Sequence, residues 1–249
     1  MPTVPSLLEK GGRTVYSIGV IHRFDAAHLV SAVARGLHGH TFTAVTRLKA
    51  DRLRAPGFVV DFGALKVIAR YIDATLDHRN LNEVLGEMSA GRDVATHLLG
   101  WCRSNLELPD GVTLAGVVVS EGGTGWEDVP LTSWRRRFEA AHHLPGLGDA
   151  HKCSRVHGHT YQVFAIPDES PDVGTAFADE MLIPLDNYLK EGFNYRYLNE
   201  WFPVPPTSEN LAQHLFAWCE EHLPKVRLAA VRVSETPSTW AEYRRKDLS

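Results

Sequence analysis

Apolar and polar positions change their period along the chain, and the changes predict strands and helices in alternation. Residues 41–48 and 160–166 are rich in Thr, Val, Phe and Tyr, which are typical of strands. Residues 64–72 instead have the composition and spacing of a helix, and Asp61 stands at a plausible helix start. The chain is therefore predicted to mix sheet and helix.

The second half of the chain repeats this order. A helix is predicted to begin after Pro206 with Thr207 and to continue through Cys219, and residues 226–233 predict a further strand. Each half is expected to run strand, strand, helix, helix, strand, strand. Such a small α+β layer leaves sheet edges and one face that association could cover.

Short motifs occur twice in the same order, at offsets of 114 to 119 residues. Phe-Asp-Ala-Ala-His at 24–28 returns as Phe-Glu-Ala-Ala-His at 138–142, and His-Gly-His-Thr at 38–41 returns at 157–160. Chance alone would give about 0.05 His-Gly-His triplets in a chain of this composition. Three more motifs return in register: Leu-Asn-Glu at 81–83 and 198–200, Trp-Cys at 101–102 and 218–219, and Val-Ser-Glu at 119–121 and 233–235.

The repeat predicts two similar domains of roughly 115 residues, a length within the usual range of small domains. We expect an N-terminal extension over residues 1–14, a first domain over 15–130 and a second over 131–249. The junction falls in the Gly-rich segment 122–130, which ends in proline and suits a turn or linker.

Composition narrows the classes of function. The 249 residues include 30 acidic and 26 basic side chains, a net charge of −4 that gives no reason to expect nucleic acid or an anionic membrane as partner. The apolar runs fall short of the roughly 18 residues of a membrane helix, and residues 1–6 do not resemble a secretory signal. Three cysteines fit a reducing compartment. We therefore expect a cytoplasmic protein with a small-molecule substrate.

Histidines in each half predict a metal site. On a strand, residues i and i+2 point to the same face, so each His-Gly-His motif presents two imidazoles side by side, and the preceding Ala-Ala-His can add a third. Three neutral imidazoles suit Zn²⁺ and leave a fourth position open, as in catalytic sites. The alternative to a metal site is that these histidines are ordinary strand residues that make hydrogen bonds. The two predicted triads are His142, His157 and His159, and His28, His38 and His40.

The cysteines differ in their surroundings. Cys153 lies four residues before His157, and its neighbours Lys152 and Arg155 favour the thiolate form. A tryptophan precedes both of the other cysteines, which occupy equivalent predicted helix positions, so we expect them in the core.

Together the motifs resemble a known family. Phe-x-Ala-Ala-His, Cys-x-x-x-His-Gly-His, Leu-Asp-His-x-x-Leu-Asn, Pro-Thr-Ser-Glu-Asn and Ser-Glu-Thr are similar to the motifs of the 6-pyruvoyl-tetrahydropterin synthase and 6-carboxytetrahydropterin synthase family. The resemblance covers nearly the whole chain, as two fused copies. It implies two tandem tunnelling-fold (T-fold) units of the α+β class, each an antiparallel four-stranded sheet with two helices inserted between strands 2 and 3.

The resemblance also implies roles for individual residues. In the family, zinc held by three histidines binds the side-chain oxygens of 7,8-dihydroneopterin triphosphate, a cysteine is the base, an Asp-His pair from a neighbouring subunit moves protons and a late glutamate anchors the pterin. By motif, the zinc ligands are His142, His157 and His159, the base is Cys153, the pair is Asp77 and His78, and the anchor is Glu235 with Thr207 and Ser208.

Each half departs from the family pattern where the other keeps it. The first half has Ala34 where the base is expected and Ser-Ala-Gly-Arg at 89–92 in place of Pro-Thr-Ser-Glu. The second half has Asn194 and Tyr195 where the first keeps Asp-His. We therefore expect an active site formed between first-half and second-half domains, and a second, non-catalytic centre at the first triad. The expected assembly is a homo-oligomer, either three chains in a pseudo-hexameric ring or a dimer of such rings.

The spacing from Cys153 to His157 resembles the bacterial 6-carboxytetrahydropterin synthase type, a lyase of 7-deazaguanine and queuosine biosynthesis that releases acetaldehyde and triphosphate. Three alternatives stay open. They are a 6-pyruvoyl-tetrahydropterin synthase that eliminates triphosphate, a non-catalytic pterin-binding paralogue, and a zinc hydrolase unrelated to pterins.

Overall fold

A computed structural model describes residues 14–29, 36–86, 90–168 and 179–245, and its contacts divide them into two compact units. The N-terminal unit contains residues 19–49 and 60–128. The C-terminal unit contains residues 14–18, 50–59 and 129–245. The C-terminal unit thus includes two segments of the first sequence repeat. Both Ala34 and Ser89 lie outside the described residues.

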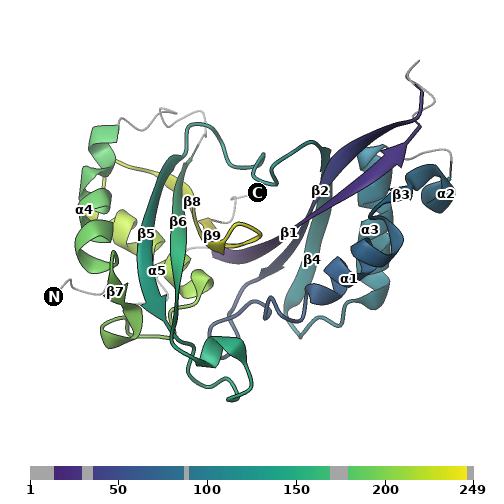
Figure 1. Ribbon diagram of the computed structural model, residues 1–249. Coiled ribbons are helices and arrows are strands. Elements are labelled where there is room, and N and C mark those ends of the chain that lie inside the picture. The colour runs from purple at the N-terminus through teal and green to yellow at the C-terminus, as the bar shows by residue number, and fades with distance from the viewer. Residues whose placement is uncertain (1–13, 30–35, 87–89, 169–178, 246–249) are drawn as a thin grey trace. The chain divides into compact units, whose positions relative to one another are not determined.

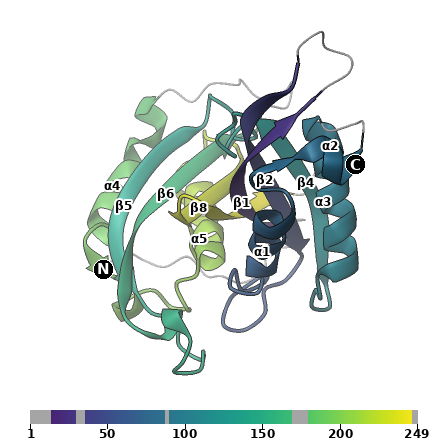
Figure 2. The same cartoon turned by 45° about the vertical axis from the view of Figure 1, so that its right-hand side comes forward.

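The N-terminal unit is a sheet with helices against it (Figures 1 and 2). Its long strands lie in the order β4-β2-β1, and the short β3 pairs in parallel with β1. The helices follow β2 and precede β4, and Ile68, Ile72, Val94 and Leu98 turn from them into the core. The elements are β1 (Thr14–His28, in this unit from residue 19), β2 (His38–Ala50), α1 (Lys66–Thr75), β3 (Arg79–Asn80), α2 (Leu81–Leu85), α3 (Gly91–Asn105) and β4 (Val112–Glu121).

The C-terminal unit repeats the order of the strands and main helices, and its described residues add the strand β9 and the short helices η1 and η2. Its strands lie in the order β9-β8-β6-β5-β7, and α4 and α5 are inserted between β6 and β8. The elements are β5 (Trp134–His142), η1 (Lys152–Ser154), β6 (His157–Pro167), η2 (Asp179–Leu182), α4 (Ile183–Gly192), β7 (Arg196–Tyr197), η3 (Leu198–Glu200), α5 (Ser208–His222), β8 (Leu228–Thr236) and β9 (Thr239–Arg245).

Strand β6 shows why its histidines occupy one end of the core. Tyr161, Val163 and Ala165 alternate along β6 and are fully buried with the apolar side chains of α4 and α5. The same alternation continues backwards to His159 and His157. The two histidines therefore extend the buried face of the sheet to the place where its apolar cover ends.

An aromatic group ties the two helices together in each unit. In the C-terminal unit, Tyr188 of α4 stacks on Trp218 of α5 at 4.3 Å between ring centroids, and its hydroxyl is 2.7 Å from His214 Nε2. The N-terminal unit repeats the arrangement with Tyr71, which stacks on an equivalent tryptophan at 4.2 Å and bonds His97 Nε2 at 2.6 Å. The C-terminal copy is the more deeply buried one.

The α+β class and the helices between the second and third strands are confirmed in both repeats. The part of the first repeat that the structure describes nevertheless has three long strands, because residues 122–133 form turns where the second repeat has β9. Glycine and proline in this stretch disfavour a strand, and Glu127 accepts the backbone N–H groups of Thr124 and Gly125 to hold the turn. None of the helices within the described ranges is long and apolar enough to cross a membrane.

The predicted start of the helix at Asp61 is wrong. Helix α1 begins at Lys66, after Leu65, whose side chain makes no capping bond. The Asp61 carboxylate instead accepts the backbone N–H of Gly63 at 2.7 Å, which stabilises the turn before the helix. The start predicted at Thr207 is confirmed, because its hydroxyl accepts the N–H of Asn210 as the N-cap of α5.

Candidate active site

The register of β5 and β6 assembles the triad of the C-terminal unit. His142 is paired with His157 across the two antiparallel strands, and His159 follows two residues later on the same face. Gly158 lets the strands pack closely, because a Cβ there would lie 3.2 Å from the carbonyl oxygen of Ala140. The ligand atoms of the three histidines lie within 4.8 Å of one another. The structure therefore brings the predicted ligands together.

Hydrogen bonds orient two of these imidazoles toward one another. His142 Nδ1 is 2.9 Å from the carbonyl oxygen of Pro206, and His157 Nδ1 is 2.7 Å from that of Arg155. Donation from each Nδ1–H leaves the Nε2 lone pairs free to face a common point. The two Nε2 atoms are 3.2 Å apart, close to the roughly 3.3 Å between two nitrogens bound tetrahedrally to one zinc.

The electrostatic setting favours neutral imidazoles. The pKa of His142 and that of His159 are both lowered to about 4, mainly by burial, and the neighbouring histidines act in the same direction. A neutral imidazole is the form that binds a metal ion. The donor set of three imidazoles therefore fits zinc, and His142 and His159 are already in the neutral, metal-binding form near pH 7.

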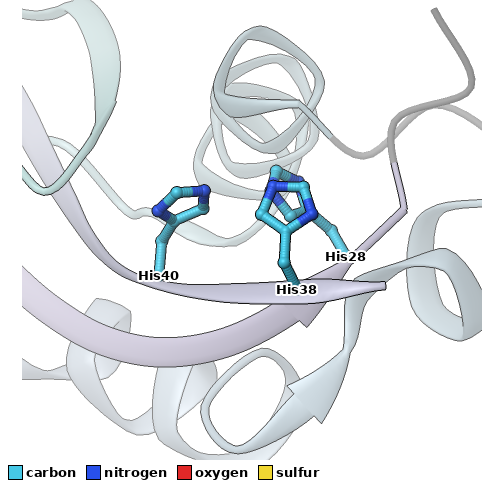
Figure 3. Close-up of side chains that lie close together, drawn as sticks. All are labelled: His28, His38 and His40. Carbon is cyan, nitrogen blue, oxygen red and sulfur yellow. The ribbon is translucent and has the colours of Figure 1, made fainter. Parts of the chain in front are cut away.

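The N-terminal unit holds the second triad in a similar arrangement (Figure 3). The rings of His38 and His40 rise side by side from β2, and His28 joins them from the end of β1. Ring centroids are 4.6 to 5.2 Å apart, and His28 is fully buried. His38 Nδ1 is 2.9 Å from the carbonyl oxygen of Gly36, so this imidazole is oriented in the same way as that of His157.

The repeated Leu-Asn-Glu motif explains how the first histidine of each triad is held. The Asn199 side chain accepts the backbone N–H of His143 at 2.9 Å and donates to its carbonyl oxygen at 2.9 Å. Asn82 makes the same pair of bonds to Leu29, at 2.7 and 3.0 Å. Each asparagine thus clamps the residue that follows a triad histidine. Sequence reasoning found the motif but not this role.

A cavity of about 410 Å³ brings the other predicted site residues to the triad of the C-terminal unit. Cys153 lies in η1, half-buried, on the wall of this cavity beside His157 and His159. Glu235, at the end of β8, lines it from another side. The full lining is Lys152, Cys153, Arg155, Val156, His157, His159, Glu235 and Thr236. The predicted base, two metal ligands and the predicted anchor therefore face one space.

The first turn of α5 supports Glu235. Ser208 donates from its hydroxyl to Glu235 Oε2 at 3.4 Å, and both Thr207 and Ser208 are buried. These three residues, predicted together as a substrate-binding set, lie within one small region of the C-terminal unit.

The profile of the 6-pyruvoyl tetrahydropterin synthase family matches residues 17–129 and again 132–246. The chain belongs to this family. It contains two tandem family units, and the T-fold described by the family accounts for the helices between the second and third strands of each repeat.

Relatives match one unit at a time. A Synechocystis 6-carboxy-5,6,7,8-tetrahydropterin synthase is 35% identical over 115 residues, which is 43% of this chain and 86% of that protein. An Archaeoglobus fulgidus protein provisionally given the same name is 36% identical over 109 residues, 43% of this chain and 90% of its own. A Pyrococcus furiosus dihydroneopterin monophosphate aldolase is 34% identical over 106 residues, which is 41% of this chain and 89% of that protein. The Caenorhabditis elegans 6-pyruvoyl tetrahydropterin synthase structure covers 46% of this chain and 94% of its own, with 26% identity and a TM-score of 0.34.

The turn at Asp77 and His78 distinguishes the two family units. His78 has a left-handed backbone (φ 54°), and its N–H donates to the carbonyl oxygen of Asp25 at 2.6 Å. Asp77 Oδ2 lies 2.8 Å from His78 Nδ1, and this hydrogen bond is the main cause that raises the pKa of His78. The histidine is exposed and oriented by its neighbour, as a proton-transfer group requires.

The second family unit keeps the backbone of this turn and replaces its chemistry. Tyr195 has a φ of 56°, and its N–H donates to the carbonyl oxygen of Glu139 at 2.6 Å. Asn194 accepts the N–H of Glu139 at 2.9 Å, where Asp77 accepts that of Asp25 at 2.9 Å. The structure therefore aligns Asn194 and Tyr195 with the Asp-His pair, and this turn has neither the carboxylate nor the imidazole of the first repeat.

Sequence reasoning missed Glu209 and the loop that contacts it. Glu209 is almost fully buried in the first turn of α5, and burial raises the pKa of its carboxyl group to about 8, with the nearby charge of Glu235 acting in the same direction. Its Oε1 accepts the backbone N–H of Val59 at 3.0 Å. Thr207 donates to the carbonyl oxygen of Gly57 at 2.9 Å. The only sequence signal was an acidic residue in the Pro-Thr-Ser-Glu-Asn motif.

Proposed function

We propose that this protein is a zinc-dependent pterin synthase that converts 7,8-dihydroneopterin triphosphate to 6-carboxy-5,6,7,8-tetrahydropterin, as a lyase of the 7-deazaguanine and queuosine pathway in the cytoplasm. The observation that carries the proposal is the single cavity lined by Cys153, His157, His159 and Glu235. The names of the Synechocystis and Archaeoglobus relatives support the carboxy product.

Zinc would be held by His142, His157 and His159, and when bound it supplies a Lewis acid that polarises substrate oxygens. Cys153 faces the same cavity and removes a proton from the carbon next to the polarised group. Lys152 also lines the cavity and favours the thiolate form of the base. A thiol that lies on the cavity wall needs no rearrangement of η1 to reach a substrate there.

Glu235 would orient the pterin. Its carboxylate accepts hydrogen bonds from the ring N–H and the amino group, which are neighbouring donors on one edge of the pterin. The Ser208 hydroxyl already contacts this carboxylate, and Thr207 fixes the start of the helix that carries the serine. These two residues hold the anchor in place.

Asp77 and His78 would complete the proton transfer. Asp77 accepts from His78 Nδ1, which leaves Nε2 available to return a proton to the substrate. The raised pKa of His78 favours its protonated, donating form. Because the second repeat has Asn194 and Tyr195 at these positions, we propose that the active site joins the C-terminal triad to the first-repeat pair, in a homo-oligomer of tandem chains.

The deciding experiment incubates the zinc-loaded protein with 7,8-dihydroneopterin triphosphate and identifies the products by mass. The expected products are 6-carboxy-5,6,7,8-tetrahydropterin, acetaldehyde and triphosphate. A pyruvoyl product would assign the chain to the other synthase type, and bound but unconverted substrate would make it a pterin-binding paralogue. A parallel incubation with 7,8-dihydroneopterin monophosphate tests the aldolase activity named for the Pyrococcus relative.

Variants separate the two centres. Cys153→Ala and Asp77→Ala should each abolish turnover, because the first removes the base and the second leaves His78 unoriented. His28→Ala should lower stability and leave the rate per active site unchanged. Loss of turnover in His28→Ala with zinc still bound at His142, His157 and His159 would show that the catalytic centre is wrongly assigned.

A further inference from the structure

We propose that the metal centre of the N-terminal unit is a closed, four-ligand zinc site in which Glu121 joins His28, His38 and His40, so that this centre is structural. The inference builds on the zinc chemistry of the proposed function, and it adds a ligand and a role for the non-catalytic triad. In the C-terminal unit the corresponding residue, Glu235, stays available for substrate.

The distance from Glu121 to the triad carries the inference. Glu121 Oε2 lies 3.8 Å from His40 Nε2. Zinc binds histidine nitrogen and carboxylate oxygen at about 2.0–2.2 Å, so two tetrahedral ligand atoms lie roughly 3.3–3.5 Å apart. The distance to His40 is therefore about half an ångström longer than in a pair bound to one zinc. The group of ligand atoms that lie within 4.8 Å of one another contains the three histidines without Glu121, so its carboxylate must also turn toward His28 and His38 to become the fourth ligand.

The backbone at the start of α3 aims this carboxylate. The N–H of Gly91 donates to Glu121 Oε1 at 3.1 Å, which leaves Oε2 directed toward His40. A Cβ at position 91 would lie 3.2 Å from the carbonyl oxygen of Val119, so glycine lets the start of α3 approach the backbone of β4 closely. In the other repeat the aligned residue is Ser208, whose hydroxyl contacts Glu235 instead. One exchange, serine for glycine, thus accompanies the change in the glutamate's partner.

A fourth protein ligand changes what the centre can do. Catalytic zinc sites keep an open position for water or substrate, whereas four protein ligands fill a structural site. The ligands come from the ends of three strands that lie side by side, with His28 on β1, His38 and His40 on β2, and Glu121 on β4. Bound zinc would cross-link the whole order β4-β2-β1 of the unit, and its binding energy would stabilise the fold directly.

The first measurement is the zinc content of the purified chain. Two zinc ions per chain are expected, and His157→Ala/His159→Ala should retain one. This variant leaves the N-terminal centre alone, so the remaining zinc ion reports on that centre. One zinc ion in the wild type and none in the double variant would overturn the proposal.

Glu121→Gln, made in the His157→Ala/His159→Ala background, tests the fourth ligand. The zinc affinity should fall at least tenfold, since even outer-shell partners of zinc ligands contribute about 10–100-fold. The matched control Glu235→Gln in the same background should leave this affinity unchanged. An unchanged affinity in Glu121→Gln would show that the carboxylate is not a ligand. Glu121→Asp, which keeps the charge, provides a second reading if the glutamine variant does not fold.

Activity measurements distinguish a failure of the structural zinc site from a failure of the proposed function. Glu121→Gln in the otherwise natural chain, with zinc in excess, should turn over pterin at the wild-type rate and lose thermal stability. If the wild-type protein converts no pterin, the proposed function fails while the zinc stoichiometry and affinity still decide the structural site. If Glu121→Gln removes activity without a change in zinc content, the structural role is refuted.

Discussion

Gly57 offers a sharp test of the loop that reaches the start of α5. The residue has a φ of 132°, and a Cβ there would overlap Asn210 Nδ2 and lie 3.1 Å from Thr207 Oγ1. We expect Gly57→Ala to displace the loop, because this φ is unfavourable for alanine and the Asn210 side chain is itself held by a hydrogen bond from Nδ2 to the carbonyl oxygen of Pro205 at 2.8 Å. The displacement breaks the bond from Val59 to Glu209 and the bond from Thr207 to Gly57.

The expected cost follows from these contacts. An alanine at this φ costs about 1–3 kcal/mol, and two lost hydrogen bonds cost about 0.5–1.5 kcal/mol each. We expect the free energy of unfolding to fall by about 3 kcal/mol, which corresponds to a Tm lower by roughly 6–12 °C for a chain of this size. The KM for the pterin should rise as well, because the loop fixes Thr207 and Glu209 at the end of α5 that supports Glu235.

The matched control is Gly111→Ala. Gly111 also has a positive φ, 80°, but no atom lies within 4 Å of its added Cβ, so only a backbone penalty of about 1 kcal/mol is expected. Differential scanning calorimetry gives Tm, and steady-state kinetics below the transition give KM. Equal Tm and KM values for the two variants would refute the steric argument and the role of the loop in the site.

Three further outcomes are expected. Tyr188→Phe leaves buried His214 Nε2 without its partner and should cost about 1–3 kcal/mol in urea unfolding, whereas Tyr71→Phe should cost less because water reaches that half-buried site. Burial lowers the pKa of His214 to about 4, so between pH 6.5 and 4 only the unfolded chain binds a proton at this residue. The free energy of unfolding should therefore fall as the pH falls through this window, and it should fall less steeply in His214→Gln. Asn199→Ala should weaken zinc binding at the C-terminal centre alone, and Asn82→Ala at the other; equal losses at both centres would contradict local clamping.

The triads could be predicted because their geometry is local. A strand places His157 and His159 on one face, and the repeat supplied a preceding strand that ends in His142. The two copies also made the exchange of Asp77 and His78 for Asn194 and Tyr195 visible without any structure.

Other features depend on contacts that the pattern does not contain. Val59 and Glu209 are 150 residues apart, and no periodicity indicates which loop meets the first turn of a helix. Asp61 has the right residue type for a cap, but its carboxylate bonds to its own turn first. Similarity between the repeats predicted a fourth strand after Glu121. The structure has turns there, because the glycine-rich sequence disfavours a strand.

The turn shared by His78 and Tyr195 also bears on how such a fusion can evolve and be redesigned. Both copies keep a left-handed backbone at the same position and the same two hydrogen bonds to the preceding strand, so the backbone of the turn is the same while its side chains differ. Asn194→Asp with Tyr195→His would rebuild an acid–imidazole pair on a backbone already shaped for it. Two codon changes thus separate this turn from the Asp77–His78 pair, and the duplication has left each chain with two copies of one backbone template.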